Sequence, residues 1–235
     1  MGDSSLGRLV GVLTSPSKAF QALRDDPRWV LPLLVLIIVA GGVSQYAQSK
    51  IDNGEMVRSF MERSGRDFSE ADIEEAIAQQ DGQSPAVKMV STGIFLVVLP
   101  MLGALFFWIG TKVFGGDPTF KQSLATFVHA MVPWWVVKSV VSLPALVSRA
   151  EISFEDASSG GLLPSNLGFL MPEEASTVMK SIAASVDIFT IWSLILMVIG
   201  YSIVARVSKT WSILLAIVLW LVATGVSLIP ALLFG

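Results

Sequence analysis

Three ionisable side chains, His129, Lys138 and Asp187, stand inside stretches of the sequence that are otherwise almost entirely apolar. A charge kept away from water is costly, so an ionisable residue in such a stretch marks a functional or structural site by default. An ammonium and a carboxylate that meet can form a fixed ion pair that orients two helices. They can also line a polar path for a proton, an ion or a lipid headgroup. We favour the fixed pair, because one isolated pair does not make a relay, and we keep the path as the alternative.

The overall composition predicts a membrane protein. Hydrophobic residues make up 53% of the 235 residues and charged residues 15%, whereas a soluble domain carries about 25% charged residues. The mean hydropathy is +0.67. With 16 Lys and Arg against 19 Asp and Glu, the chain has no basic field that would hold nucleic acid. One histidine and no cysteine exclude a multi-histidine or thiolate metal site, and we expect no cofactor.

The apolar stretches that surround these side chains are long enough to cross a hydrocarbon core of about 30 Å, which takes roughly 20 helical residues. There are five, at residues 29–48, 89–114, 120–147, 182–207 and 211–234. We therefore expect an all-α polytopic membrane protein, a bundle of five transmembrane helices. Residues 1–28 would form an N-terminal segment and residues 29–235 the membrane domain, with outer loops at 49–88 and 148–181.

Positive charges near the ends of the spans predict the orientation. The short turns at 115–119 and 207–210 are flanked by Lys and Arg, which places them on the inner side. The N-terminus is then cytoplasmic and the C-terminus outside. The inner side carries four Asp and eight basic residues near the membrane: Arg8, Lys18, Arg24, Arg28, Lys112, Lys121, Arg206 and Lys209.

A short helix is expected before the first span. Ser15 is a suitable N-cap and Pro16 a suitable first helical residue, and Phe20 and Leu23 fall on one face. This N-terminal helix either lies on the inner leaflet as an interfacial helix or packs on the ends of the protein's own helices. The first span could also be read as a signal-peptide core. The 28 residues before it, with two aspartates, argue against that, because a signal n-region is short and basic.

The two outer loops have different compositions. In residues 49–88, Ser69 followed by Asp72 has the spacing of a capping box and predicts a short acidic helix with a structural role. Residues 148–181 are rich in Gly, Ser and Pro around SSGGLLPSNLG, and we expect them to be irregular.

The positions of the charged residues along the spans limit which of them can meet. At 1.5 Å per residue, Lys138 lies about 14 Å and Asp187 about 8 Å below the outer ends of the third and fourth spans. A lysine extends its stem toward the surface, so these two side chains can pair in the outer half of the bundle. His129 precedes Lys138 by nine residues, which is half a turn out of phase on a regular helix. We expect His129 to be a hydrogen-bonded packing residue.

No sequence motif indicates catalysis. The chain contains no HExxH, no P-loop and no GxSxG, the patterns that would indicate metal-assisted hydrolysis, phosphoryl transfer or acyl transfer. We therefore expect a protein that is not an enzyme and has no catalytic residues.

Three segments carry a resemblance to a known family. They are LTSPSKAFQALRDDPRWVLPLLVL near the N-terminus, GGDPTFKQSLATFVHAMVP in the third span and VDIFTIWSLILMVIGYS in the fourth. In their order and spacing they resemble the bacterial branch of the Yip1 family of multispanning membrane proteins. The family pattern falls on Pro133, Asp187, Phe189, Trp192 and Gly200.

The resemblance implies five spans and a cytoplasmic N-terminus, in a bacterial cytoplasmic membrane. Eukaryotic relatives are linked to vesicle traffic, Rab GTPases and membrane shaping, whereas the N-terminal extension that they use for partners is reduced here to about 28 residues. The expected function is a scaffold or adaptor that organises membrane proteins or lipids, as a possible homo-oligomer. The alternative is a small permease or channel that uses Lys138 and Asp187. The family also implies that Asp187 fixes the fourth span against the third.

Overall fold

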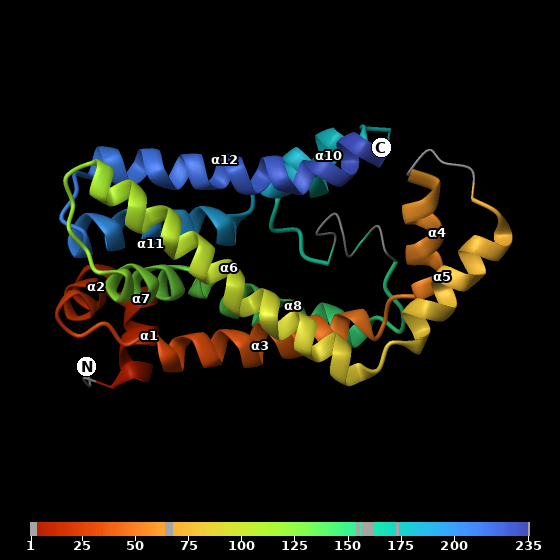
Figure 1. Ribbon diagram of the computed structural model, residues 1–235, viewed down its shortest axis with the longest axis horizontal. Helices are drawn as coiled ribbons and strands as arrows, with labels where there is room; N and C mark the ends of the chain where they lie inside the picture. The colour runs from red at the N-terminus through yellow and green to blue at the C-terminus, as the bar shows by residue number, and fades with distance from the viewer. Residues whose placement is uncertain (1–3, 64–67, 154–155, 157–161, 173, 235) are drawn as a thin grey trace.

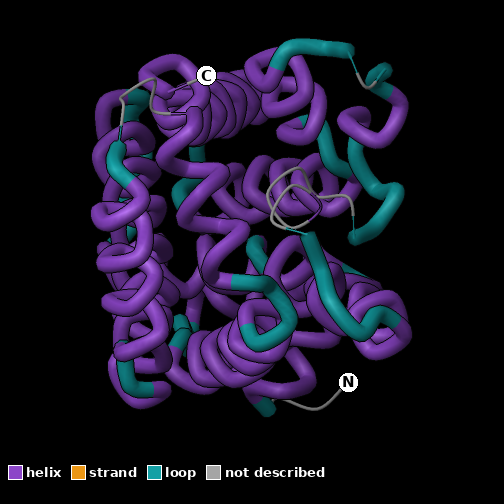
Figure 2. Tube along the Cα trace, turned by 90° about the vertical axis from the view of Figure 1, so that its right-hand side faces the viewer, coloured by secondary structure: helices purple, strands orange, loops and turns teal. Residues whose placement is uncertain are grey.

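The computed structural model describes residues 4–63, 68–153, 156, 162–172 and 174–234. The described residues form helices joined by loops, and their only β structure is two isolated bridges. Figure 1 shows the long helices running along one axis, and Figure 2 views the same helices from one end of that axis.

Four helical segments of the described chain are long and apolar enough to cross a membrane. The first, second and last of them are α3 (Val30–Gln48), α6 (Pro85–Val113) and the part of α12 (Lys209–Phe234) up to Ile229. The remaining one covers Phe120–Ser148. These segments correspond to four of the five predicted spans.

The predicted fourth span differs from the expectation, because residues 182–207 do not form one continuous helix. The chain is divided there into α10 (Thr177–Ser185) and α11 (Ile188–Val204). With 17 residues, α11 is about 26 Å long, which is less than a hydrocarbon core of about 30 Å. The prediction of an unbroken helix is wrong, and helix length by itself does not confirm a fifth span.

The third span is also irregular. It consists of α7 (Phe120–Ala130), the π-helical turn η1 (Pro133–Val137) and α8 (Lys138–Ser148). Pro133 has no backbone N–H, and the N–H of Lys138 bonds five residues back to the Pro133 carbonyl. The regular 100° step that placed His129 and Lys138 on opposite faces therefore does not hold across this turn.

The N-terminal segment forms two helices, of which only the second was expected. These are α1 (Ser5–Thr14) and α2 (Pro16–Asp25). In α2, Phe20 and Leu23 are fully buried. A Cβ atom placed on Gly200 of α11 would lie 2.8 Å from Cε1 of Phe20, so helix and ring are in tight contact. Of the two alternatives for α2, the structure shows packing on the protein's own helices; an interfacial position is not confirmed.

One buried tyrosine joins three helices of the bundle. The ring of Tyr201 in α11 stacks on Phe107 of α6, with ring centroids 4.0 Å apart and planes 4° apart. Its hydroxyl donates to the carbonyl of Ser123 in α7 at 2.9 Å, and the Ser123 hydroxyl donates to the Ala104 carbonyl at 2.7 Å. Three helices are thus joined through stacking and satisfied polar groups in a buried setting.

A hydrophilic arm extends beyond the bundle at the end opposite the N-terminal helices. It consists of α4 (Asn53–Arg63), which was not expected, and α5 (Glu70–Gly82), which was. The predicted capping box at the start of α5 is present, with both reciprocal bonds between Ser69 and Asp72. The hydroxyl and then the amide of Ser69 lower the pKa of the Asp72 carboxyl below its usual value.

The second outer loop is less irregular than expected. It contains the short 3-10 helix η2 (Leu167–Leu170) and the start of α10. Part of the SSGGLLPSNLG stretch, at residues 158–161, lies outside the described residues.

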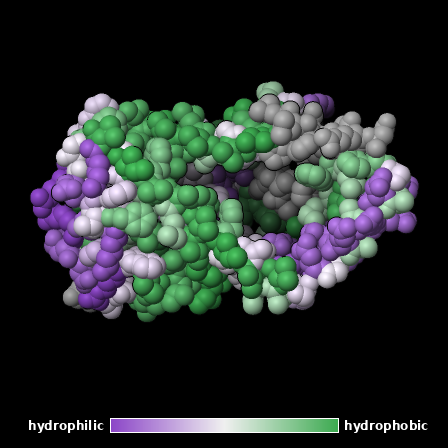
Figure 3. All heavy atoms as spheres, viewed as in Figure 1, coloured by the Kyte–Doolittle hydropathy of each residue, from purple (hydrophilic) through white to green (hydrophobic). Residues whose placement is uncertain are grey.

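The surface of the bundle is apolar along most of its length. Figure 3 shows this belt between hydrophilic residues at one end and the α4–α5 arm at the other. Large apolar side chains stand exposed on several helices, among them Ile38, Leu102 and Val222. Such a wide exposed apolar surface is typical of a protein covered by lipid.

Candidate functional site

Asp187 lies at the break in the predicted fourth span and is the N-cap residue of α11. Its backbone is extended, with φ −116° and ψ 141°, and its Oδ1 accepts the amides of Phe189 at 2.8 Å and Thr190 at 3.3 Å. Aspartate is among the preferred N-cap residues, since its oxygen satisfies free amides and its charge opposes the positive end of the helix. The charge stands in an apolar stretch because it begins a helix there.

The second carboxylate oxygen of Asp187 joins two other elements. Oδ2 accepts the ammonium of Lys138 at 3.0 Å and the hydroxyl of Ser165 at 2.6 Å. The Asp187 side chain is only 2% exposed. A buried carboxylate is tolerated when a cation and further donors compensate it, and here four donors surround the two oxygens.

The loop before α10 also satisfies the backbone at the break. The amide of Leu167 donates to the Val186 carbonyl at 3.1 Å, and the amide of Ile188 donates to the Ser165 carbonyl at 2.9 Å. This antiparallel bridge aligns Asn166 with Asp187. Irregular backbone at membrane depth is tolerated only where protein groups satisfy it, so residues 165–167 make the interruption possible.

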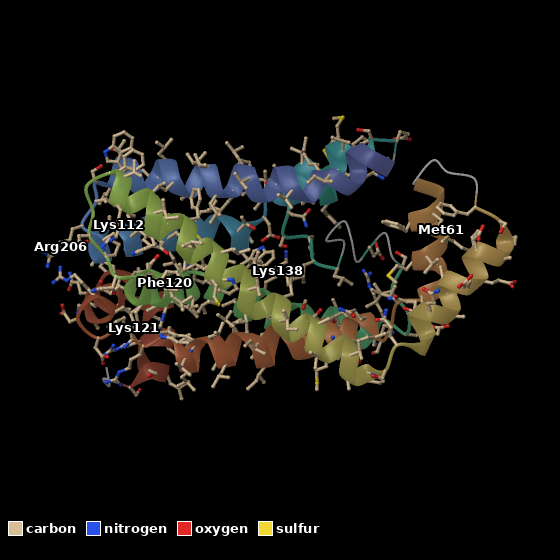
Figure 4. All side chains as sticks on the ribbon, viewed as in Figure 1. Met61, Lys112, Phe120, Lys121, Lys138 and Arg206 are labelled. Carbon is tan, nitrogen blue, oxygen red and sulfur yellow. The ribbon has the colours of Figure 1, made fainter. Side chains whose placement is uncertain are left out.

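Lys138 approaches Asp187 from the third span. It is the first residue of α8, directly after the π-helical turn, and Figure 4 shows it midway along the molecule. Its ammonium also lies 5.8 Å from the centroid of the Trp134 ring, within the range of a cation–π contact. The Lys138 side chain is 28% exposed, so the cation is the accessible member of the pair.

His129 is separate from this pair. It lies in α7, is fully buried, and its Nδ1 is 2.8 Å from the Ala125 carbonyl. No hydrogen bond or ion pair within the described part of the chain connects it to Lys138 or Asp187. The structure therefore brings together two of the three ionisable residues, through the pairing that the sequence predicts.

The remaining residues of the family pattern lie in the third span and along α11. Pro133 begins the π-helical turn that precedes Lys138, and the backbone amide of Phe189 donates a hydrogen bond to Oδ1 of Asp187. Trp192 is partly buried against the core, and Gly200 leaves room for Phe20. Each of these residues therefore contributes to packing or to helix geometry.

Two features of the site were missed from the sequence. Ser165 stands 22 residues from Asp187 in a loop, and no spacing rule points to it. The helix break did have a local signal, because an aspartate directly before an apolar run is an N-cap pattern. Among the described residues, no three His, Asp or Glu side chains gather in a way that could hold a metal ion.

Comparison with known proteins shows which family the chain belongs to. The family model of the Yip1 domain matches residues 10–229. The chain is also similar to the membrane protein YknW of Bacillus subtilis (strain 168), with 27% identity over 228 residues, which cover 95% of this chain and 90% of that relative. No solved structure matches. Because the family model covers nearly the whole chain, the protein belongs to the Yip1 domain family of membrane proteins.

Proposed function

We propose that this protein is an integral membrane scaffold or adaptor that organises membrane proteins or lipids and has no catalytic activity. The proposal rests on the carboxylate of Asp187. The side chain is 2% exposed, and its two oxygens accept four hydrogen bonds from protein groups. A transport site must exchange its partners with a solute. Two donors to Asp187 are amides of its own helix, which suits a fixed joint better than an exchanging site.

We also propose that the N-terminus is cytoplasmic, the C-terminus outside, and the membrane the bacterial cytoplasmic membrane. Lys112, Lys121 and Arg206 gather at one end of the molecule, as Figure 4 displays, and positive residues favour the cytoplasmic side. Helix α1 and the end of α12 lie at opposite ends of the bundle in Figure 1. In this arrangement, α10 and α11 together make the fifth crossing.

The α4–α5 arm supplies a surface for other proteins, because it projects from the lipid-covered belt and exposes polar side chains. The exposed apolar helices leave room for contacts with other membrane proteins or with a second copy of the chain. One observation keeps the permease alternative open, namely the 28% exposure of the Lys138 side chain.

Photo-crosslinking in native membranes tests the scaffold. A photoreactive phenylalanine derivative at Glu75, exposed on α5, should give discrete protein adducts, and the same group at lipid-facing Ile38 serves as the matched control. An adduct of twice the chain mass would identify a homo-oligomer.

Flux measurements distinguish the permease alternative. Purified protein in liposomes should move neither protons nor potassium ions above the rate of empty liposomes. Flux that disappears in Asp187→Asn, while the variant keeps its thermal stability, would contradict the scaffold and support a path through the Lys138 pair.

A further inference from the structure

A cavity of about 500 Å³ opens at the end of the bundle that carries the N-terminal helices. It lies where the chain enters α3 and where α7 begins. Its wall combines charged and apolar side chains, among them Asp26, Arg28, Trp29, Leu31, Leu34 and Lys121.

The charged part of the wall has a cation available for a ligand. Asp26 is already bound: its Oδ2 accepts Nε of Arg28 at 2.5 Å and Nη2 of Arg8 at 3.1 Å. Lys121, one residue into α7, is exposed and forms no ion pair with a described carboxylate. Figure 4 places it at the end of the molecule where Lys112 and Arg206 also lie. A negatively charged group in the cavity would therefore meet uncompensated positive charge.

The apolar part of the wall continues out of the cavity along α3. Leu31 is 39% exposed and Leu34 is 48% exposed, and Ile38, one turn further along the helix, is 70% exposed. Residues at this spacing share one face of a helix. Trp29 also lines the cavity, and tryptophan is enriched at the boundary between headgroups and hydrocarbon.

We propose that this cavity binds the headgroup of an anionic phospholipid. The phosphodiester lies against Lys121 and Arg28, and an acyl chain follows Leu31, Leu34 and Ile38 along the outside of α3. Basic pockets beside membrane helices on the cytoplasmic side are suited to such headgroups, and each lysine near an anionic surface contributes about 1 kcal/mol. A free phosphate ion would use the cations alone and gain nothing from the apolar track.

The lipid site deepens the proposed scaffold role, since a protein that organises lipids needs a place to hold one. It does not depend on the protein contacts of the α4–α5 arm. If no lipid binds in the cavity, the crosslinks from Glu75 to other proteins are still expected. If Glu75 gives no crosslinks, lipid binding in the cavity is still expected.

Native mass spectrometry of the purified full chain in detergent tests the proposal, with dioleoylphosphatidylglycerol and dioleoylphosphatidylcholine as probes. Phosphatidylglycerol should bind one copy per chain more tightly than phosphatidylcholine. Lys121→Gln should weaken its binding about fivefold, the equivalent of one lysine at a membrane surface. The matched control is Lys112→Gln, which removes the same charge at the same end from a lysine that lies 3.8 Å from Asp117 and outside the cavity.

A second pair of variants tests the apolar track. Leu34→Ser should reduce phosphatidylglycerol binding, and Leu102→Ser, an equal change on the exposed face of α6, should not. Three results would overturn the proposal: equal binding of the two lipids, an equal loss in Lys112→Gln and Lys121→Gln, or displacement of the lipid by millimolar inorganic phosphate. The last result would identify a site for free phosphate.

Discussion

At the scale of single residues, Asp187 combines two interactions that usually occur apart. One oxygen caps α11, and the other accepts Lys138 and Ser165. The two partners of the ion pair are not equivalent, because Asp187 is 2% exposed and Lys138 is 28% exposed. Removing Lys138, the partner of the buried Asp187 charge, should therefore destabilise the protein more than removing the charge of Asp187 itself.

Lys138→Met should lower the free energy of unfolding by about 1 to 3 kcal/mol, because the Asp187 charge stays buried without its cation. This loss is smaller than for a fully buried ion pair, because the Lys138 side chain is partly hydrated. Asp187→Asn should cost only about 1 kcal/mol, because asparagine is an equally good N-cap and the lysine can turn to water. Thermal unfolding in detergent measures both changes. A larger loss for Asp187→Asn than for Lys138→Met would contradict the fixed-pair interpretation.

At the scale of elements, glycines decide how closely the helices approach. A Cβ atom on Gly103 of α6 would lie 2.1 Å from Cζ of Phe127 in α7, whereas a Cβ on Gly93 of the same helix would meet nothing within 4 Å. The contact between α6 and α7 therefore depends on the missing side chain at Gly103.

Gly103→Ala should destabilise the protein by about 1 to 3 kcal/mol, because the added methyl forces Phe127 or the helix to move. Gly93→Ala is the matched control and should leave the melting temperature unchanged or slightly raised, because alanine favours a helix interior. Equal melting temperatures for the two variants would mean that Phe127 adapts without cost.

At the scale of the whole molecule, the alternating direction of the helices along one axis sets the topology. The apolar belt in Figure 3 separates a hydrophilic end from the hydrophilic α4–α5 arm at the other end. The passage through α10 and α11 differs from the other crossings, since α11 has 17 residues and begins at a buried break.

Cysteine labelling of the cysteine-free chain tests this topology in intact cells. An impermeant maleimide should label Glu75→Cys and Glu174→Cys directly, and Asp117→Cys and Lys209→Cys only after permeabilisation, because the proposed topology puts the two groups on opposite sides of the membrane. Labelling of Glu174→Cys and Lys209→Cys from the same side would show that α10 and α11 do not cross.

The sequence by itself determined the membrane class, the positions of four long apolar helices and the capping box at Ser69, and it showed that Lys138 can reach Asp187. These features depend on local composition, on spacing along a helix and on the high cost of an unpaired charge in an apolar setting. Only the tertiary structure decided that Ser165 completes the site, that Phe20 packs against Gly200, and that Arg28 and Lys121 share a cavity. Each of these brings together segments distant in the chain, and such contacts follow from packing that no local pattern encodes.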